Sequence, residues 1–171
     1  MITVQVTKIG DTLGDRLRQL EALPGKLDEL AGAAGAFVAN WAQQAFEDED
    51  KRPLPWSPRR GGNSDRPLLK RSRALQRSIR SVSLGGGKAA VTSDRPYAAF
   101  HQHGTNPYTI KARNRRALFW PGAAHPVKEV RHPGLPRRPF IPIDDAGNLM
   151  PAAATELEEI LTARLDALLK P

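Results

Sequence analysis

The arrangement of apolar and polar residues changes within the first 50 positions of the chain. Apolar residues alternate with polar ones over residues 2–7, a period of two that predicts a strand with one buried face. Beyond them, apolar residues recur at a spacing that places them on one face of a helix. Because Pro24 cannot continue a helix, we expect two helices, over about 11–22 and 25–47, or one kinked helix. The apolar stripe consists of Leu13, Leu17, Leu20, Leu27, Ala31, Ala34, Val38, Trp41 and Ala45.

A stretch rich in proline, glycine and arginine follows, from residue 51 to residue 67. Its prolines and glycines deny it regular structure, and residues 51–80 carry ten Lys or Arg but a single acidic residue. We therefore predict a long basic loop that becomes ordered against a partner.

The middle of the chain predicts a hairpin and a short helix. A helical turn leads into a strand at about 79–84, Gly85–Gly87 supplies the connection, and residues 88–93 form the returning strand. Asp94 is a suitable N-cap for the helix that follows, because its side chain can accept hydrogen bonds from the first turn. Gly104 is placed to end this helix in a left-handed conformation.

A second long basic loop is predicted over about 105–126, with strands near 117–120 and 127–131. The chain then closes with an amphipathic helix over about 151–169, whose apolar face carries Leu157, Ile160, Leu161, Leu165 and Leu168. Together these elements predict a single domain, residues 1–171, of the α+β class. Its small, mostly antiparallel sheet is flanked by N-terminal and C-terminal helices.

Composition excludes several kinds of site. The chain has no cysteine, which rules out disulfides and Cys-based metal or redox sites. No apolar run reaches the roughly 18 residues that a membrane span needs, and the N-terminus lacks the pattern of a secretion signal. We expect a soluble protein that is cytoplasmic where it is made and does not bind membranes.

Charge is distributed unevenly. The net charge is +8, made up of −5 over residues 1–50, +17 over residues 51–138 and −4 over residues 139–171. A basic middle between acidic ends suggests a nucleic-acid surface, or neighbouring copies that pair head to tail by charge. Solvated basic loops are the alternative interpretation.

Twelve residues are candidates for contacting DNA or a protein partner. Arginine and lysine side chains could bind phosphates in a sequence-independent, salt-sensitive mode. The aromatic residues among them are not spaced like a base-stacking platform. We therefore expect Trp56 and Trp120 to anchor loops or to fill protein interfaces, where Trp and Arg are enriched. The candidates are Arg59, Arg60, Arg66, Lys70, Arg71, Arg73, Trp56, Lys111, Arg113, Arg115, Arg116 and Trp120.

Catalytic patterns are weak. His101 and His103 could hold a metal on a strand, where alternate residues share a face, but the local pattern is helical and separates them. The sequence has no nucleophile elbow, phosphate-binding loop or defined carboxylate pair. We expect no catalytic residue, no metal and no cofactor.

Several short motifs stand in a fixed order through about residues 35–169. In this order and spacing the chain resembles the phage tail-completion and neck proteins, a family of small virion morphogenesis proteins that assemble at the head–tail junction. The motifs are Pro55–Pro58, Leu69–Leu75, Tyr97–Gly104, His132–Gly134 and Arg138–Ile141.

The resemblance implies a structural protein of the virion. Copies are expected to form a ring, a hexamer or alternatively a dodecamer, between the DNA-filled head and the tail. Expected partners are the head-closure or connector protein, the tail-tube or terminator protein, and the genome DNA in the channel. Similar proteins serve as completion factor, neck ring or tail terminator. The residues assigned to fold maintenance are Tyr97, His101, Gly104, Pro139 and Phe140.

Two alternatives stay open at this point. The first is a nonspecific DNA-binding protein that acts alone, and the second is a metal-dependent hydrolase that uses His101 and His103. The ring interpretation gives the two long loops, 51–67 and 105–126, the role of reaching neighbouring subunits.

Overall fold

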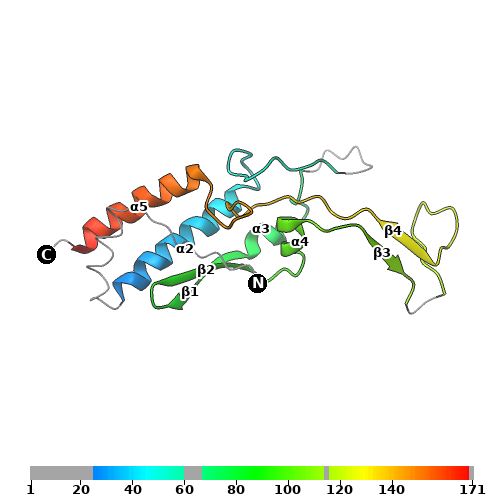
Figure 1. Cartoon of the computed structure of the whole chain (residues 1–171), viewed down its shortest axis with the longest axis horizontal. Helices are drawn as coiled ribbons and strands as arrows, with labels where there is room; N and C mark the ends of the chain where they lie inside the picture. The colour runs from blue at the N-terminus through cyan, green and yellow to red at the C-terminus, as the bar shows by residue number, and fades with distance from the viewer. Residues whose placement is uncertain (1–24, 60–66, 114–115, 170–171) are drawn as a thin grey trace.

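The computed structural model describes residues 25–59, 67–113 and 116–169. The predicted strand over residues 2–7 and the predicted helix over 11–22 lie outside the described residues. Figure 1 shows a body of two long helices and a hairpin, with a thin two-stranded ribbon projecting from one end. In chain order the elements are α2 (Lys26–Gln44), α3 (Ala74–Ser78), β1 (Ile79–Gly85), β2 (Lys88–Ser93), α4 (Ala98–His103), β3 (Tyr108–Lys111), β4 (Glu129–His132) and α5 (Pro151–Leu169).

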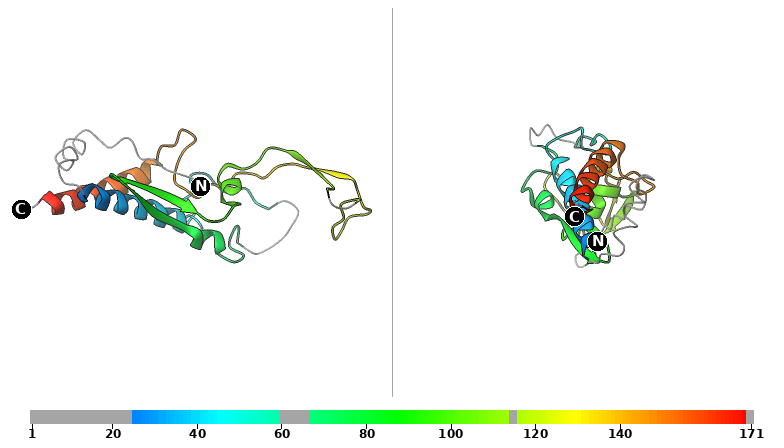
Figure 2. Two further views of the ribbon diagram at one scale, coloured as in Figure 1. Left: turned by 90° about the horizontal axis from the view of Figure 1, so that it is seen from below. Right: turned by 90° about the vertical axis from the view of Figure 1, so that its left-hand side faces the viewer.

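The body has three layers, in which α2 lies between α5 and the β1–β2 hairpin (Figures 1 and 2). On one side of α2, Leu30 packs against α5, and on the other side Val38 and Ala42 join a cluster with residues of the hairpin. A helix covered on two sides needs small residues for close approach, which explains its many alanines. The predicted α+β class is confirmed, although α5 packs on α2 rather than directly on the sheet.

The predicted hairpin is confirmed as β1 and β2. Ile79 pairs with Ser93 at the open end, and Gly85 pairs with Lys88 at the turn. Gly85, Gly86 and Gly87 have φ angles of 75°, 60° and 70°, a region that residues with a Cβ atom rarely adopt. The glycine triplet therefore makes the turn possible.

The predicted C-terminal helix is confirmed as α5, with Pro151 as its first residue. Leu157, Leu161 and Leu165 follow one another at intervals of four residues and are buried with Leu30 of α2. This apolar contact holds α5 against α2.

The second basic region contains more structure than predicted. β3 forms within the predicted loop 105–126 and pairs with β4, Tyr108 opposite His132 and Lys111 opposite Glu129. The strand predicted near 117–120 is wrong, since only an isolated bridge between Leu118 and Val127 is present. β3 has only four residues and follows Pro107, so its alternation is too short to stand out in the sequence.

The predicted start of α4 is also wrong. The N-cap is Tyr97 instead of Asp94, and its side chain makes no capping hydrogen bond. Pro96 disfavours a helical conformation for Arg95, while the Arg95 backbone N–H donates to the Ser93 hydroxyl over 3.2 Å. A turn therefore precedes the helix.

Gly35 allows α2 to lie close to the hairpin, and replacing it should be costly. A Cβ atom at this position would stand 2.9 Å from the Ala89 Cβ and would also collide with the Ser81 side chain. We predict that Gly35→Ala lowers the free energy of unfolding by about 1–3 kcal/mol, measured by urea denaturation. The matched control is Gly32→Ala in the same helix, where nothing lies within 4 Å. It should stabilise the protein by about 0.5–1 kcal/mol, and equal effects of the two variants would contradict the prediction.

Candidate functional site

Trp56 lies in the core of the body. Its side chain is 7% exposed, and its ring meets Phe46 edge-on at 5.4 Å between ring centres. Nε1 donates a hydrogen bond to the Pro139 carbonyl over 2.7 Å. Of the two roles expected for Trp56, loop anchor and interface contact, this burial leaves the first: the indole anchors the segment before residue 60 to the Arg-Pro-Phe-Ile motif.

Gln102 of α4 fixes the same motif from the other side. Its Oε1 accepts hydrogen bonds from the backbone N–H groups of Phe140 and Ile141, over 3.0 and 3.1 Å. Gln102 and Phe140 are both buried, so water cannot replace the glutamine as the hydrogen-bond acceptor of these backbone groups. A single glutamine in a short helix carries no sequence signal, and sequence reasoning missed it.

Removing the Gln102 amide should destabilise the fold. Gln102→Leu keeps the volume but leaves two buried N–H groups without an acceptor, at about 1–3 kcal/mol each. We predict a loss of at least about 2 kcal/mol in the free energy of unfolding, measured by urea denaturation. His103→Leu on the exposed side of α4 is the control and should cost little. A Gln102→Leu variant as stable as the control would contradict this account.

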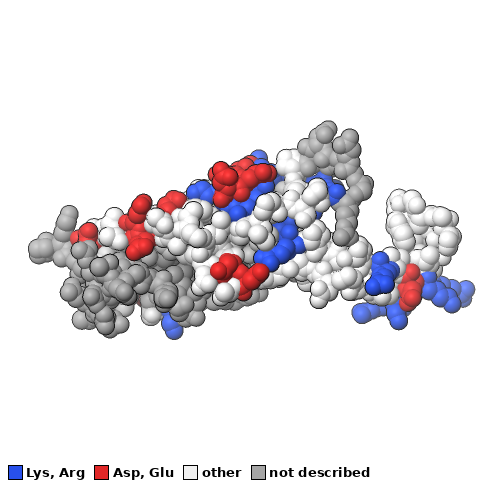
Figure 3. Space-filling view, turned by 45° about the horizontal axis from the view of Figure 1, so that its top comes forward, with Lys and Arg blue, Asp and Glu red and all other residues white. Residues whose placement is uncertain are grey.

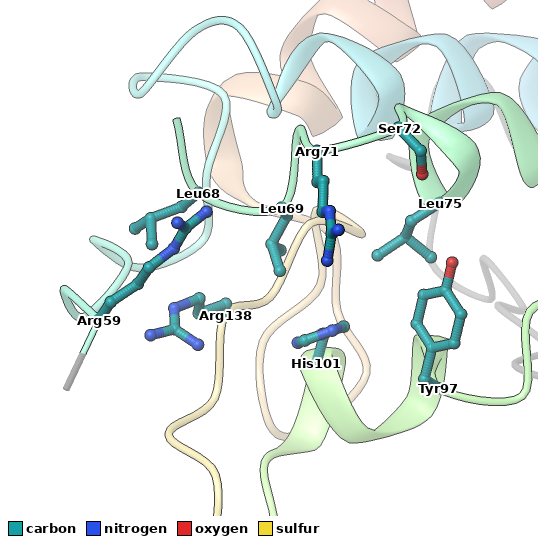
Figure 4. A pocket seen from close by; sticks show the side chains of 9 residues that line it. All are labelled: Arg59, Leu68, Leu69, Arg71, Ser72, Leu75, Tyr97, His101 and Arg138. Carbon is teal, nitrogen blue, oxygen red and sulfur yellow. The ribbon is translucent and has the colours of Figure 1, made fainter. Parts of the chain in front are cut away.

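Beside this junction lies a pocket of about 320 Å³. Figure 4 shows its side chains approaching from α4, from the Arg59 and Arg138 segments and from the turn before α3. Leucines form the apolar part of the wall and arginines the charged part, a combination suited to an acidic group next to an apolar one. The lining residues are Arg59, Leu68, Leu69, Arg71, Ser72, Leu75, Tyr97, His101 and Arg138.

Arg138 is built into the pocket wall. Its guanidinium donates to the carbonyl oxygens of Ser57 and Pro58 over 2.8 and 3.0 Å. Burial lowers the pKa of Arg138 from its ordinary value, and the nearby Arg59 adds to the effect. The Arg138 backbone N–H donates to the His101 carbonyl over 2.7 Å. Two motifs of the sequence therefore meet here, Tyr97–Gly104 and Arg138–Ile141.

His101 is half-buried in this wall, and no described residue forms a hydrogen bond with its Nδ1 atom. Its ring stands edge-on to Tyr97, with ring centres 5.9 Å apart. Burial lowers the pKa of His101 below its ordinary value of 6.5, and Arg138 lowers it further. The imidazole is therefore neutral at physiological pH.

The lowered pKa of His101 predicts a pH dependence of stability. Between the ordinary pKa of 6.5 and the lower folded value, the unfolded chain binds a proton that the folded chain does not, so stability falls as pH falls. Wild type should lose more stability than His101→Gln between about pH 7 and pH 5, compared by urea denaturation. Glu47 and Asp144 have pKa values lowered from 4.5 and 3.8. What these two carboxylates add to stability is therefore lost only below about pH 5, and the loss is the same in wild type and in His101→Gln. Parallel curves for the two proteins would contradict the prediction.

Gly104 lies where two segments cross. Its φ is 73° with ψ −173°, so φ is positive as predicted while ψ is extended rather than left-handed helical. A Cβ atom would stand 2.8 Å from the Leu135 carbonyl oxygen. Of the other residues assigned to fold maintenance, Pro139 and Phe140 are fully buried, whereas Tyr97 is exposed at the pocket.

Some basic candidates are paired within the chain. Lys70 forms a close ion pair with Glu47, and Arg73 lies 3.9 Å from the same carboxylate. The hydrogen bond from Lys70 is the main cause that lowers the pKa of Glu47. Arg71 is exposed, has no ion-pair partner among the described residues and points into the pocket (Figure 4). Three further candidates lie outside the described residues: Arg60, Arg66 and Arg115.

The remaining candidates lie on the projecting ribbon. We call residues 105–135 the arm, which is closed at its base by the bridge between Thr105 and Leu135. Near its tip, Phe119 is 68% exposed and Trp120 is 45% exposed. The arm also carries the exposed candidates Lys111, Arg113 and Arg116. Among the described candidates, Arg59 and Arg71 thus line the pocket, and a separate group lies on the arm.

An acidic surface lies on the body, where the end of α2 meets the start of α5. An ion pair of 3.5 Å between Lys51 Nζ and Glu156 Oε2 connects the end of α2 with the start of α5. Figure 3 shows acidic side chains on the body with basic side chains beside them, and a second group of basic side chains on the arm. We call the exposed acidic residues here the acidic shoulder: Asp48, Glu49, Asp50, Glu156 and Glu159.

The described residues offer no group of three His, Asp or Glu side chains placed to hold a metal ion. His101 and His103 do not converge on a shared site: His101 lines the pocket, and His103 is exposed. No helix in the described part of the chain is long and apolar enough to cross a membrane.

Comparison with known proteins identifies the family. The family model described as the phage virion morphogenesis family matches residues 5–166. Searches of curated proteins and of solved structures found no match. The match extends over nearly the whole sequence and confirms the virion morphogenesis resemblance that the motifs indicated. The chain belongs to the phage virion morphogenesis family.

Proposed function

We propose that this protein forms a ring at the junction of the phage head and tail and joins the tail to the DNA-filled head. It is made in the host cytoplasm and becomes part of the virion. The family match supports a role in phage assembly. The observation that carries the finer proposal is the arm, which leaves the body and exposes aromatic side chains at its tip.

A two-stranded ribbon is only marginally stable in water without further packing. The arm has two strands of four residues, and all four residues of β3 are exposed. Exposed apolar surface of this kind marks a contact site, so the arm requires a partner. A projecting element that meets a different surface on the next copy makes a heterologous contact, which gives a ring when the rotation between copies closes. We favour a hexamer, with a dodecamer as the alternative.

The contacts that several basic residues make within the chain favour a structural role over DNA binding. Lys70 and Arg73 already face Glu47 of the same chain, and Arg138 is bound to backbone carbonyls. A lone DNA-binding protein would instead present such cations free to phosphates. The exposed cations of the arm serve the neighbouring proteins of the junction, the head-closure or connector protein and the tail-tube or terminator protein.

Complementation tests this function directly. A phage in which the gene is interrupted should produce DNA-filled heads and separate tails, seen by electron microscopy, and adding the purified protein to that lysate should join them. The control is the same lysate with buffer alone. Joined particles without the protein, or heads that fail to fill, would contradict the proposal.

A further inference from the structure

The pocket beside α4 holds positive charge that no carboxylate in its wall balances. Three of its nine lining residues are arginines, Arg59, Arg71 and Arg138, and none of the nine is Asp or Glu. Figure 4 shows the Arg71 guanidinium pointing toward His101. A concavity lined by charges of one sign concentrates their field and favours a bound ion of the opposite sign. The wall therefore favours an anion.

Arg138 is the buried cation of this wall, with only 8% of its surface exposed. Nε and one terminal nitrogen of its guanidinium donate to the Ser57 and Pro58 carbonyls. The other terminal nitrogen has no hydrogen-bond acceptor among the described residues. Buried charges in proteins are normally paired with an opposite charge. Arg138 is thus held in a fixed position with N–H groups left for a ligand.

His101 adds a second polar group without a partner. Its Nδ1 atom is buried and forms no hydrogen bond with any described residue, whereas buried polar atoms normally have one. Burial lowers the pKa of both His101 and Arg138, and in each case a neighbouring arginine lowers it further. A carboxylate beside these groups would raise both pKa values instead. A bound carboxylate would therefore relieve two groups at once.

The apolar half of the wall comes from a strained segment. Leu69 and Arg73 have φ angles of 60° and 53° and are the described non-glycine residues with positive φ. Such strain persists where surrounding contacts fix it, and it gathers at ligand-binding sites. Here Lys70 and Arg73 hold the segment to Glu47, while Arg71 lines the pocket. The leucines of the wall are Leu68, Leu69 and Leu75.

The size and lining of the pocket indicate what it binds. Its volume of about 320 Å³ is near the lower end for ligand sites, which leaves room for a few side chains but not for a DNA duplex. A phosphate group alone would satisfy the arginines and leave the leucines uncovered. A protein segment can supply a carboxylate and an apolar side chain together, and the chain belongs to a virion assembly family.

We propose that this pocket binds a segment of a neighbouring virion protein in which a carboxylate lies beside an apolar side chain. The carboxylate would lie between Arg71 and Arg138, where charge-assisted hydrogen bonds are strongest, and the apolar side chain would cover the leucines. The site goes beyond the proposed ring contact, because the pocket is on the body and not on the arm.

Blocked peptides test the ligand class by nuclear magnetic resonance titration of the purified protein. The acidic probe is acetyl-Leu-Glu-Leu-amide, and acetyl-Leu-Gln-Leu with a free C-terminal carboxylate distinguishes a chain end from an acidic side chain. The controls are acetyl-Leu-Gln-Leu-amide, without charge, and acetyl-Gly-Glu-Gly-amide, without apolar side chains. Each leucine peptide is repeated with phenylalanine. Both controls should bind at least about tenfold more weakly than the better carboxylate peptide, whose binding should shift the signals of Leu75 and His101.

A matched pair of variants locates the binding. Arg71→Gln removes a cation of the pocket and should leave the fold intact, because Arg71 is exposed and has no ion-pair partner among the described residues. It should weaken peptide binding at least about tenfold. Arg77→Gln makes the same change on the exposed surface of α3, outside the pocket, and should bind like wild type. Circular dichroism should show both variants folded.

The outcomes separate this inference from the proposed function. A carboxylate peptide whose binding depends on Arg71 supports the inference, whichever of the two carboxylates it carries. Equal binding of charged and uncharged peptides, equal effects of the two variants, or no binding by any carboxylate peptide overturns it. A short DNA duplex whose binding depends on Arg71, where the peptides do not bind, would make the pocket a phosphate site and also overturn it. Peptide binding needs only the folded chain, so failure to form rings or join particles overturns the proposed function alone.

Discussion

Replacing Phe119 and Trp120 together by serine should leave the chain folded but unable to assemble. Both side chains are largely exposed at the arm tip, 68% and 45%, so they contribute little to the folding of a single chain. Buried aromatic anchors in interfaces contribute about 2 kcal/mol or more each. We therefore expect assembly to weaken by at least about 100-fold, measured by light scattering across a concentration series.

A control on the body makes this result specific. Phe100→Ser removes an exposed aromatic residue, 52% exposed, from α4. It lies away from the arm tip and should assemble like wild type, with an unchanged circular dichroism spectrum. Normal assembly of the Phe119 and Trp120 variant would show that the arm tip makes no subunit contact.

Replacing Phe140 by alanine should cause the largest loss of stability. Phe140 is fully buried, and its ring lies 5.5 Å from that of Phe46, centre to centre. Large-to-small substitutions at such sites remove burial and leave a cavity, at about 3–5 kcal/mol. Because domains are stable by only about 5–15 kcal/mol, the variant should unfold at much lower urea concentration than wild type.

Phe100→Ala is the matched control for Phe140→Ala. The same side chain is removed, but from an exposed position, so the free energy of unfolding should change by less than about 0.5 kcal/mol. Similar midpoints for the two variants would contradict the placement of Phe140 at the centre of the core.

The long periodic segments were predictable from sequence. α5 has leucines every four residues and a proline at its start, and the β1–β2 hairpin has a glycine triplet between two strands. Both signals are local, because they depend on residues within one element. Their bounds in the structure therefore agree closely with the prediction.

Features that depend on contacts between distant segments were not predictable. Trp56 follows a proline in a basic loop, which resembles a surface anchor, but its indole reaches Pro139 across 83 positions of sequence. Gln102 is important only because Phe140 and Ile141 pass beside it. β3 becomes a strand because β4 pairs with it, and its own four residues are too few to indicate it.

The sequence could predict which type of residue forms the candidate site, but not which of these residues lie together on one surface. Charge counting found the basic middle of the chain. It could not show that Lys70 and Arg73 face Glu47, while Arg113 and Arg116 are exposed on the arm. The tertiary fold decides which Lys and Arg side chains form ion pairs within the chain and which remain exposed at the surface.

The mass of the purified protein by light scattering, first alone and then mixed with a tail-tube preparation of its phage, tests the central claim most directly. We expect a discrete ring, or binding confined to the ends of the tubes. A monomer that ignores tails but binds any DNA duplex at low salt would contradict it.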